Sequence, residues 1–193
     1  MKIKPEIRVI GIDDAPFKKE HTGDVLIVGS IFRSGIFMDG LLSCYVKKDG
    51  LDATDRISKM INESRHKDQL RVIFLNGVAV AGFNIIDIQR LNRKTNLPVI
   101  IVIRDMPNFE KIKNALSRFK DKRKRLKMIK NAGKVHEIKI KKSRIFVQFV
   151  GIDLNDVRKL LKITCTHSLV PEPLRISHLI ASGIVEGHSR GKA

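Results

Sequence analysis

Three short apolar runs rich in Ile and Val constrain the fold of this chain more than any other feature. They cover residues 7–12, 70–75 and 98–103, and segments with the spacing of amphipathic helices, residues 52–64 and 84–93, separate them. Apolar runs of this length are typical of strands buried on both faces, and strands that alternate with helices favour parallel pairing. We therefore expect an α/β domain with helices on both faces of a sheet.

Two more strands are predicted directly after the first run. Residues 24–32 and 36–46 are joined by Arg33, Ser34 and Gly35, a short turn containing Gly that predicts an antiparallel hairpin. The pairing in the sheet is then mixed, and the expected order of elements is βββ-α-β-α-β-α.

A basic helix and a basic hairpin are expected next. Asn108 is a suitable N-cap for one long helix that continues through Leu116 to Ile129. Residues 134–140 and 144–150 alternate between apolar and polar side chains, as the two strands of a hairpin do.

Two helices complete the predicted fold. One covers residues 153–163, and the last begins at Pro171, because proline is tolerated in a first helical turn, and ends at Gly183. We expect one domain over residues 1–193, which divides into a core at 1–107, the basic helix and hairpin at 108–150 and the C-terminal helices at 151–193.

Positive charge is concentrated in one segment. Residues 111–144 contain 15 Lys and Arg and two acids, a net charge of +13 out of +18 for the whole chain. Acids at i±4 positions are too few to relieve this repulsion, which favours a polyanionic partner over a merely solubilising surface. A membrane surface fits less well because the segment has no Trp or Tyr. We expect nucleic acid as the partner, bound by Arg118, Lys120, Lys122, Arg123, Lys124, Arg125, Lys127 and Lys130.

Several functional classes are disfavoured. Cys44 and Cys165 are far apart and belong to no Cys/His cluster with zinc spacing, so neither a disulfide framework nor a zinc site is expected. The sequence has no serine-hydrolase elbow and no dinucleotide-binding glycine motif. It also has no signal-peptide pattern and no apolar run long enough to span a membrane, so we expect a soluble, cytoplasmic protein.

Carboxylates at the ends of predicted elements are the candidates for chemistry. Asp13 and Asp14 directly follow a buried strand, where two adjacent like charges repel each other unless a cation or hydrogen-bond donors offset them. Asp52 lies at the start of the first helix. Divalent cations such as Mg²⁺ or Mn²⁺ prefer several converging oxygen ligands, and phosphoryl transfer on such ions uses carboxylates.

Each of these residues also has a structural interpretation. Asp commonly forms turns, which competes with a functional role for Asp13 and Asp14. Asp52 or Asp55 can cap the first helix, and Asp87 is expected on a solvated helix face. His178 falls on an apolar helix, and we interpret it as a core residue.

Four segments together carry a resemblance to a known family. They are GIDDAPF at residues 11–17, DGLDAT at 49–54, AGFNIID at 81–87 and PEPLRISHLIA at 171–181. With them the chain resembles an archaeal domain-of-unknown-function family, number ninety-nine, over nearly its whole length. That family is in turn similar to endonuclease V, which implies a ribonuclease H-like fold.

The resemblance also implies a metal site. In endonuclease V, Mg²⁺ is held by an Asp of the first strand, a carboxylate beside the following helix and an Asp in an Asp-Gly pair after the fourth strand. Asp13 matches the first position and Asp52, more loosely, the second, whereas the third position holds Asn76 before Gly77. Asn offers one carbonyl oxygen and no charge, so the implied metal affinity is lower. The candidate catalytic residues are Asp13, Asp14 and Asp52, and the candidate metal ligands are these three and Asn76.

Three functional hypotheses follow. The first is a nucleic-acid-binding protein that resembles endonuclease V and cleaves phosphodiesters of DNA or RNA with Mg²⁺ or Mn²⁺. The second is a non-catalytic nucleic-acid-binding or scaffold protein that kept the nuclease fold and lost the metal site, which Asn76 favours. The third is an enzyme that acts on a small anionic substrate in the same cleft, with Lys and Arg as anion clamps.

Overall fold

One seven-stranded mixed sheet organises the protein. The structure is a computed structural model that describes residues 3–141 and 143–189. The strand order is β3-β2-β1-β4-β7-β9-β8; β1, β4 and β7 are parallel to one another, and the other neighbours pair antiparallel. The strands are β1 (Arg8–Asp14), β2 (Asp24–Arg33), β3 (Phe37–Lys47), β4 (Leu70–Asn76), β7 (Val99–Ile103), β8 (His136–Ile140) and β9 (Ser143–Val150). The predicted α/β class and mixed pairing are confirmed.

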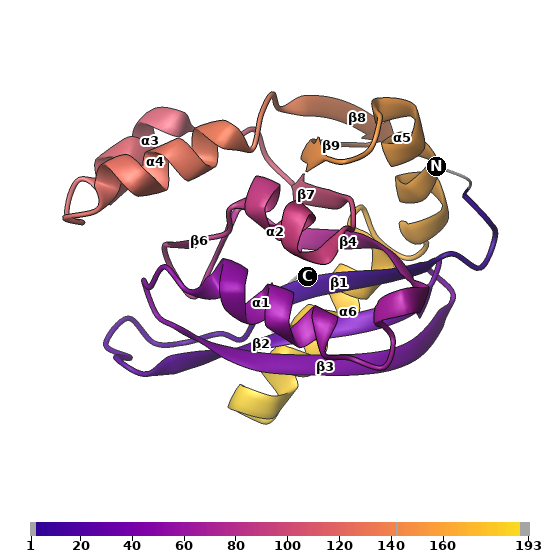
Figure 1. The fold of residues 1–193 in the computed structure, drawn as a ribbon, viewed down its shortest axis with the longest axis horizontal. Helices are drawn as coiled ribbons and strands as arrows, with labels where there is room; N and C mark the ends of the chain where they lie inside the picture. The colour runs from indigo at the N-terminus through magenta and orange to yellow at the C-terminus, as the bar shows by residue number, and fades with distance from the viewer. Residues whose placement is uncertain (1–2, 142, 190–193) are drawn as a thin grey trace.

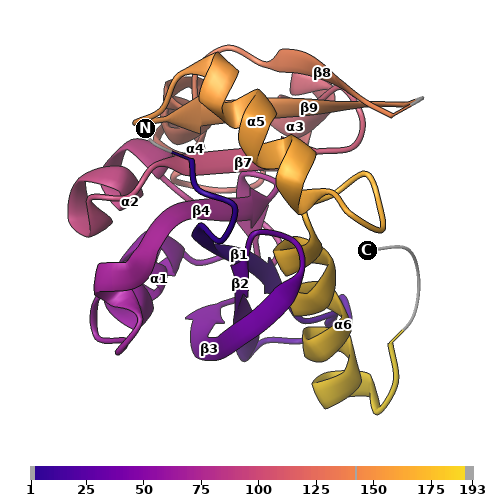
Figure 2. The ribbon, with the colours of Figure 1, turned by 90° about the vertical axis from the view of Figure 1, so that its right-hand side faces the viewer.

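Helices cover both faces of the sheet. On one face lie α1 (Ala53–Asn62) and α2 (Ile88–Thr95), and a 3₁₀ turn (Lys67–Gln69) leads from α1 to β4. On the other face lie α5 (Leu154–Thr164) and α6 (Glu172–Glu186), as Figure 2 shows. Side chains of β1 alternate between the two layers: Ile10 and Ile12 pack in the core under α1 and α2, and Val9 packs in the core under α5 and α6.

A short hairpin replaces the beginning of the helix that was predicted from residue 84. It consists of β5 (Ala79–Val80) and β6 (Asn84–Ile85), and α2 begins only at Ile88. Asp87, predicted on a solvated helix face, is the N-cap of α2: its carboxylate accepts a hydrogen bond from Arg90 N at 3.0 Å. The prediction was wrong because the apolar spacing of residues 84–93 does not distinguish two short strands from a first helical turn.

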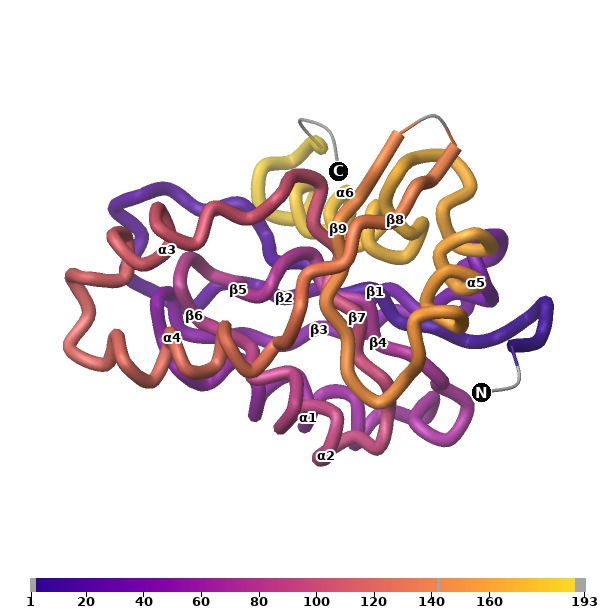
Figure 3. The backbone as a smooth tube through the Cα atoms, turned by 90° about the horizontal axis from the view of Figure 1, so that it is seen from above, coloured from indigo at the N-terminus to yellow at the C-terminus, as the bar shows by residue number. Residues whose placement is uncertain are grey.

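The predicted long basic helix is two helices, α3 (Phe109–Leu116) and α4 (Lys122–Asn131), which we call the basic wing. They project from one end of the molecule (Figure 1) and lie far from α5 when seen from above (Figure 3). Asn108 caps α3 as predicted. The break lets side chains of both helices, among them Leu116 and Met128, pack with Ile85 in a small core of their own. A single straight helix would turn part of that apolar set toward water.

The last helix is longer than predicted. It passes through Gly183 and ends at Glu186, followed by the C-cap Gly187, whose φ of +76° is the left-handed conformation that favours glycine there. The prediction of an end at Gly183 was wrong because a glycine is typical of a helix C-terminus but is also tolerated inside a helix. Among the described residues, no helix is long and apolar enough to cross a membrane.

Candidate functional site

Asp13, Asn76 and His178 form a hydrogen-bonded cluster at one edge of the sheet. Because β1 and β4 are parallel, Asp13 and Asn76 come to the same edge. Asn76 Nδ2 donates to Asp13 Oδ2 at 3.1 Å, and His178 Nδ1 of α6 lies 3.1 Å from the same oxygen. The other oxygen of Asp13 accepts from the backbone N–H of Asp14 at 3.0 Å. Asp13 is 3% exposed, so these contacts hold a carboxylate that is almost entirely shielded from water.

Asp14 lies on the opposite face of β1. Its carboxylate accepts a hydrogen bond from Ala81 N, at the tip of the β5–β6 hairpin, at 2.7 Å. Burial, and after it the negative charge of Asp13, raise the pKa of Asp14 to about 6. The predicted repulsion between the two acids is therefore present, although strand alternation turns their side chains to different layers.

His178 is a site residue that the sequence prediction missed, because it was interpreted as a core residue. The backbone contact between α6 and β1 positions it. A Cβ on Gly11 would lie 2.4 Å from Leu174 N, so glycine is required for this approach. Ser177 Oγ donates to Gly11 O at 2.8 Å and accepts from Ser30 N at 2.8 Å. Ser177 and His178 lie among apolar residues of α6, and buried polar side chains need partners, but the sequence does not show which residue His178 contacts.

Asp52 belongs to a different hydrogen-bond network. Asp52 is at the N-cap position of α1, but its side chain makes no capping bond. Instead it accepts from Asn84 Nδ2 at 2.7 Å and from Lys47 N, and it pairs with Arg56 at 3.7 Å. The acid of Asp55 does not cap either; it pairs with Arg90 and Lys94 at 2.8 Å. The structure thus joins Asp13 to Asn76 by a hydrogen bond and places Asp14 next to Asp13 in the strand but on its opposite face. Asp52 bonds Asn84 instead.

This placement does not provide a preformed metal site. Within residues 3–141 and 143–189, no group of three or more His, Cys, Asp or Glu side chains could hold a metal ion. Both oxygens of Asp13 already accept or face hydrogen-bond donors, and the amide of Asn76 turns its Nδ2 toward them. As placed, the predicted ligands do not fit Mg²⁺ or Mn²⁺, so the chemistry below is derived from the side chains of the chain itself.

The β5–β6 hairpin connects the acids to the basic wing. Ala81, which donates to Asp14, accepts from Asp49 N at 2.8 Å, and Phe83 N donates to the Asp49 carboxylate at 2.8 Å. The same carboxylate pairs with Arg118, between α3 and α4, at 3.8 Å. These contacts connect Asp14 to Arg118 through the hairpin and Asp49, and they fix the basic wing relative to Asp14.

Most of the predicted phosphate-binding residues are exposed on this wing. Arg125 is the exception, because it is only 3% exposed. Its guanidinium bonds Asp121 and donates to the backbone oxygens of Asp49, Gly50 and Phe83. The exposed cations are Arg118, Lys120, Lys122, Arg123, Lys124, Lys127 and Lys130. The structure therefore presents seven of the eight predicted cations to solvent and uses Arg125 to attach α4 to the loops beside the acids.

Comparisons with known proteins agree with this architecture. Residues 5–185 match the family described as Endonuclease dU. A UPF0215 protein of Methanosarcina barkeri is 50% identical over 191 residues, which cover 99% of this chain and 97% of that protein. A crystal structure of a protein of unknown function from Archaeoglobus fulgidus has a TM-score of 0.85 at 36% identity and covers 93% of this chain and 99% of that one.

A more distant structural neighbour is a nuclease. Endonuclease V of Ciona intestinalis, solved with a 24mer DNA that contains an inosine followed by a ribo-adenosine, has a TM-score of 0.60 at 14% identity. The match covers 93% of this chain and 86% of that one. The chain shares a nuclease fold with endonuclease V.

Proposed function

Because the chain belongs to the endonuclease dU family, we propose that it is an endonuclease that cleaves DNA at deoxyuridine. The family is called an endonuclease, an enzyme that cleaves within a nucleic-acid strand, and dU is the usual abbreviation of deoxyuridine. The observation that carries the proposal is the shielded cluster of Asp13, Asn76 and His178, in a chain whose exposed cations are connected to the neighbouring Asp14 through the β5–β6 hairpin and Asp49.

The pair of His178 and Asp13 suits the activation of water. With a proton on Nδ1, His178 donates to Asp13 Oδ2, and its Nε2 is then the basic nitrogen of the ring. In the proposed step a water oxygen attacks phosphorus, its proton passes to Nε2 of His178, the P–O bond to the leaving oxygen breaks, and that oxygen takes a proton from solvent. Asp13 holds the ring in this tautomer and stabilises the imidazolium that forms, as a carboxylate beside a catalytic histidine does.

The basic wing is proposed to hold the substrate. Its seven exposed cations contact phosphates, which positions the strand without reading its sequence. The β5–β6 hairpin fixes the wing near Asp14, so that a strand on the wing passes the end of β1.

Dependence on Mg²⁺ or Mn²⁺ stays a prediction, because the residues as placed do not form the ligand set. Calorimetric titration of the protein with either ion tests it. A saturable site that Asp13→Asn removes would support the metal ligands predicted from the sequence, whereas the absence of saturable binding would contradict them.

The activity is tested with a labelled DNA strand that contains one deoxyuridine, and with the same strand containing thymidine as the control substrate. We expect cleavage only of the first, and a loss of about 10²-fold or more in kcat for Asp13→Asn and for His178→Gln. Asp55→Asn is the matched control, since it also removes one carboxylate but lies in the ion pairs of α1 and α2. Equal rates for Asp13→Asn and Asp55→Asn would contradict the proposed role of Asp13.

A second candidate function is nucleic-acid binding without cleavage. It is favoured by Asn76, whose amide donates to the Asp13 carboxylate and so occupies an oxygen that a reacting group could use. Salt-dependent binding of DNA by the wild type, together with intact DNA and RNA panels after long incubation, is the result that selects this function over the first.

A further inference from the structure

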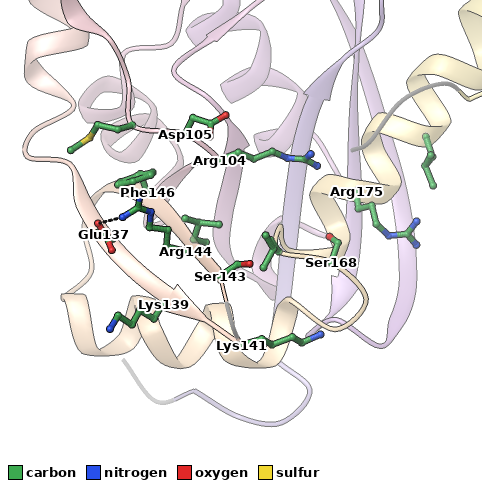
Figure 4. A pocket seen from close by; sticks show the side chains of 14 residues that line it. Arg104, Asp105, Glu137, Lys139, Lys141, Ser143, Arg144, Phe146, Ser168 and Arg175 are labelled. Carbon is green, nitrogen blue, oxygen red and sulfur yellow. Dashed lines mark ion pairs between the residues drawn. The ribbon is translucent and has the colours of Figure 1, made fainter.

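A second basic surface lies on the α6 side of the sheet, away from the basic wing. It is a cleft of about 1210 Å³ between the β8–β9 hairpin and α6, and its lining side chains come from the loop after β7, the hairpin, the loop before α6 and α6 itself (Figure 4). Its basic side chains are Arg104, Lys139, Lys141, Arg144 and Arg175.

The charge of the cleft is only partly neutralised. Two acids, Asp105 and Glu137, line it with the five cations, and Glu137 pairs with Arg144 at 3.7 Å. Arg175 is held by Glu172 through two contacts of 2.5 and 3.0 Å. Arg104 and Lys139 make no ion pair within the described part of the chain. Lys141 makes no ion pair there either, and its Nζ donates to Thr166 O at 3.0 Å. The cleft therefore has a net positive charge, with three cations that no acid of the described residues pairs with.

The floor of the cleft is apolar. Leu169, in the loop before α6, and Leu179 of α6 line it and are partly exposed. Ile145 and Phe146 of β9 also line it but are almost fully buried. An anion that carries both negative charge and flat apolar groups matches such a surface, as unpaired nucleotides do when their bases leave the stack. A paired duplex would present its phosphates but keep its bases inside.

The cleft is also next to the proposed catalytic pair. Arg175 and Leu179 line it, and His178, between them on α6, is the residue that contacts Asp13. A nucleic-acid strand that enters the cleft thus lies beside α6, the helix that carries His178, the proposed general base.

We propose that this cleft binds an unpaired stretch of the DNA strand that is cleaved, with phosphates at Arg104 and Lys139 and bases against the apolar floor. That the bound strand is DNA, and that it is the strand to be cleaved, rests on the proposed function. The role of the cleft differs from the role of the basic wing, which contacts phosphates on the other side of the acids.

Binding measured without cleavage tests the proposal separately from the activity. The probe is a fluorescein-labelled 15-nucleotide single strand that contains thymidine in place of deoxyuridine, so that the proposed activity does not cleave it. It is titrated in EDTA at several NaCl concentrations, with the fully paired duplex in parallel. The test variant is Arg104→Glu/Lys139→Glu. The control variant is Lys59→Glu/Arg65→Glu, which changes the net charge equally at exposed positions on and after α1, on the opposite face of the sheet.

We expect the test variant to raise the Kd for the single strand at least tenfold over the control variant. The slope of log Kd against log NaCl concentration should fall by about 1.4, since each lost phosphate contact on a single strand contributes about 0.7. The Kd for the duplex should change less than the Kd for the single strand. Equal Kd values for the two variants would overturn the proposal, and so would an equal loss of single-strand and duplex binding. Neither result depends on whether the wild type cleaves.

Discussion

Arg125 offers the sharpest test of how the basic wing is built. Although it lies in a run of cations, its side chain is buried and bonds Asp121 at 2.7 and 3.0 Å. It also donates to Asp49 O at 2.8 Å, to Gly50 O at 2.9 Å and to Phe83 O. Its guanidinium stacks on Phe119, 4.4 Å from the ring centroid. We therefore predict that Arg125→Ala acts on stability and on the attachment of the wing.

The magnitude follows from the groups that lose a partner. Three backbone oxygens lose a charged donor, and hydrogen bonds to charged groups contribute about 1.5–3 kcal/mol each. Asp121 is partly exposed and regains water, which lowers the cost of its lost partner. The three contributions belong to one side chain and do not add. We therefore expect a loss of about 3–5 kcal/mol, the range for removing one partner of a buried charged pair. For a chain of this size that corresponds to a decrease in Tm of roughly 6–20 °C if unfolding is global.

Arg123→Ala is the matched control. Arg123 lies two residues earlier on α4, has the same charge and is exposed. Thermal unfolding gives the Tm of both variants, and hydrogen exchange reports whether residues 109–131 open locally. Arg123→Ala should keep the wild-type Tm and lower the salt slope for duplex binding by about 0.9, the contribution of one phosphate contact.

The reasoning is refuted if Arg125→Ala and Arg123→Ala have the same Tm and the same exchange protection in the wing. It is also refuted if Arg125→Ala keeps its stability and loses one phosphate contact in the salt titration, because Arg125 would then face nucleic acid.

Three further predictions concern single side chains. The pKa of Asp14 is raised from 3.8 to about 6, so the contribution of Asp14 to the free energy of unfolding falls by roughly 3 kcal/mol as the pH rises from about 4 to about 6. Asp14→Asn keeps an acceptor for Ala81 N and should raise the urea midpoint at pH 7 but not at pH 4. An equal rise at both pH values would contradict the assignment of the effect to the buried, ionised carboxylate of Asp14. Gly11→Ala should cost about 1–3 kcal/mol, because its Cβ would meet the backbone of α6, and a wild-type Tm would disprove that contact. Burial raises the pKa of Cys165 to about 12, so its thiol should react with a disulfide reagent at pH 8 far more slowly than in urea.

The sequence was most informative where burial alone decides the structure. The apolar runs that became β1, β4 and β7 are buried on both faces, so composition and length were enough to predict them. The Gly-containing turn at residues 33–35 likewise predicted the pairing of β2 and β3. In contrast, apolar spacing alone did not show that residues 84–87 belong to a hairpin and a helix cap or that the basic helix is broken.

The candidate site was predicted in part for a related reason. Asp13 and Asp14 could be singled out because they follow a buried strand. The side chain of His178 could not, because its partner is 165 residues away in sequence and only the packing of α6 on β1 brings the two together. Asp52 and Arg125 show the converse: their types and positions suited ligand binding, but the side-chain amide of Asn84 bonds Asp52, and backbone oxygens such as Gly50 O accept from Arg125.

The contact between α6 and β1 has a consequence for how the protein is made. Ser177 and Gly11 are 166 residues apart in sequence, so this contact closes only after almost all of the chain has left the ribosome. The basic wing comes earlier in the chain and has a small core of its own. A chain that stops before α6 is therefore expected to keep the cations that are proposed to bind nucleic acid but to lack the His178–Asp13 pair. The proposed binding surface would then form during synthesis before the proposed catalytic pair.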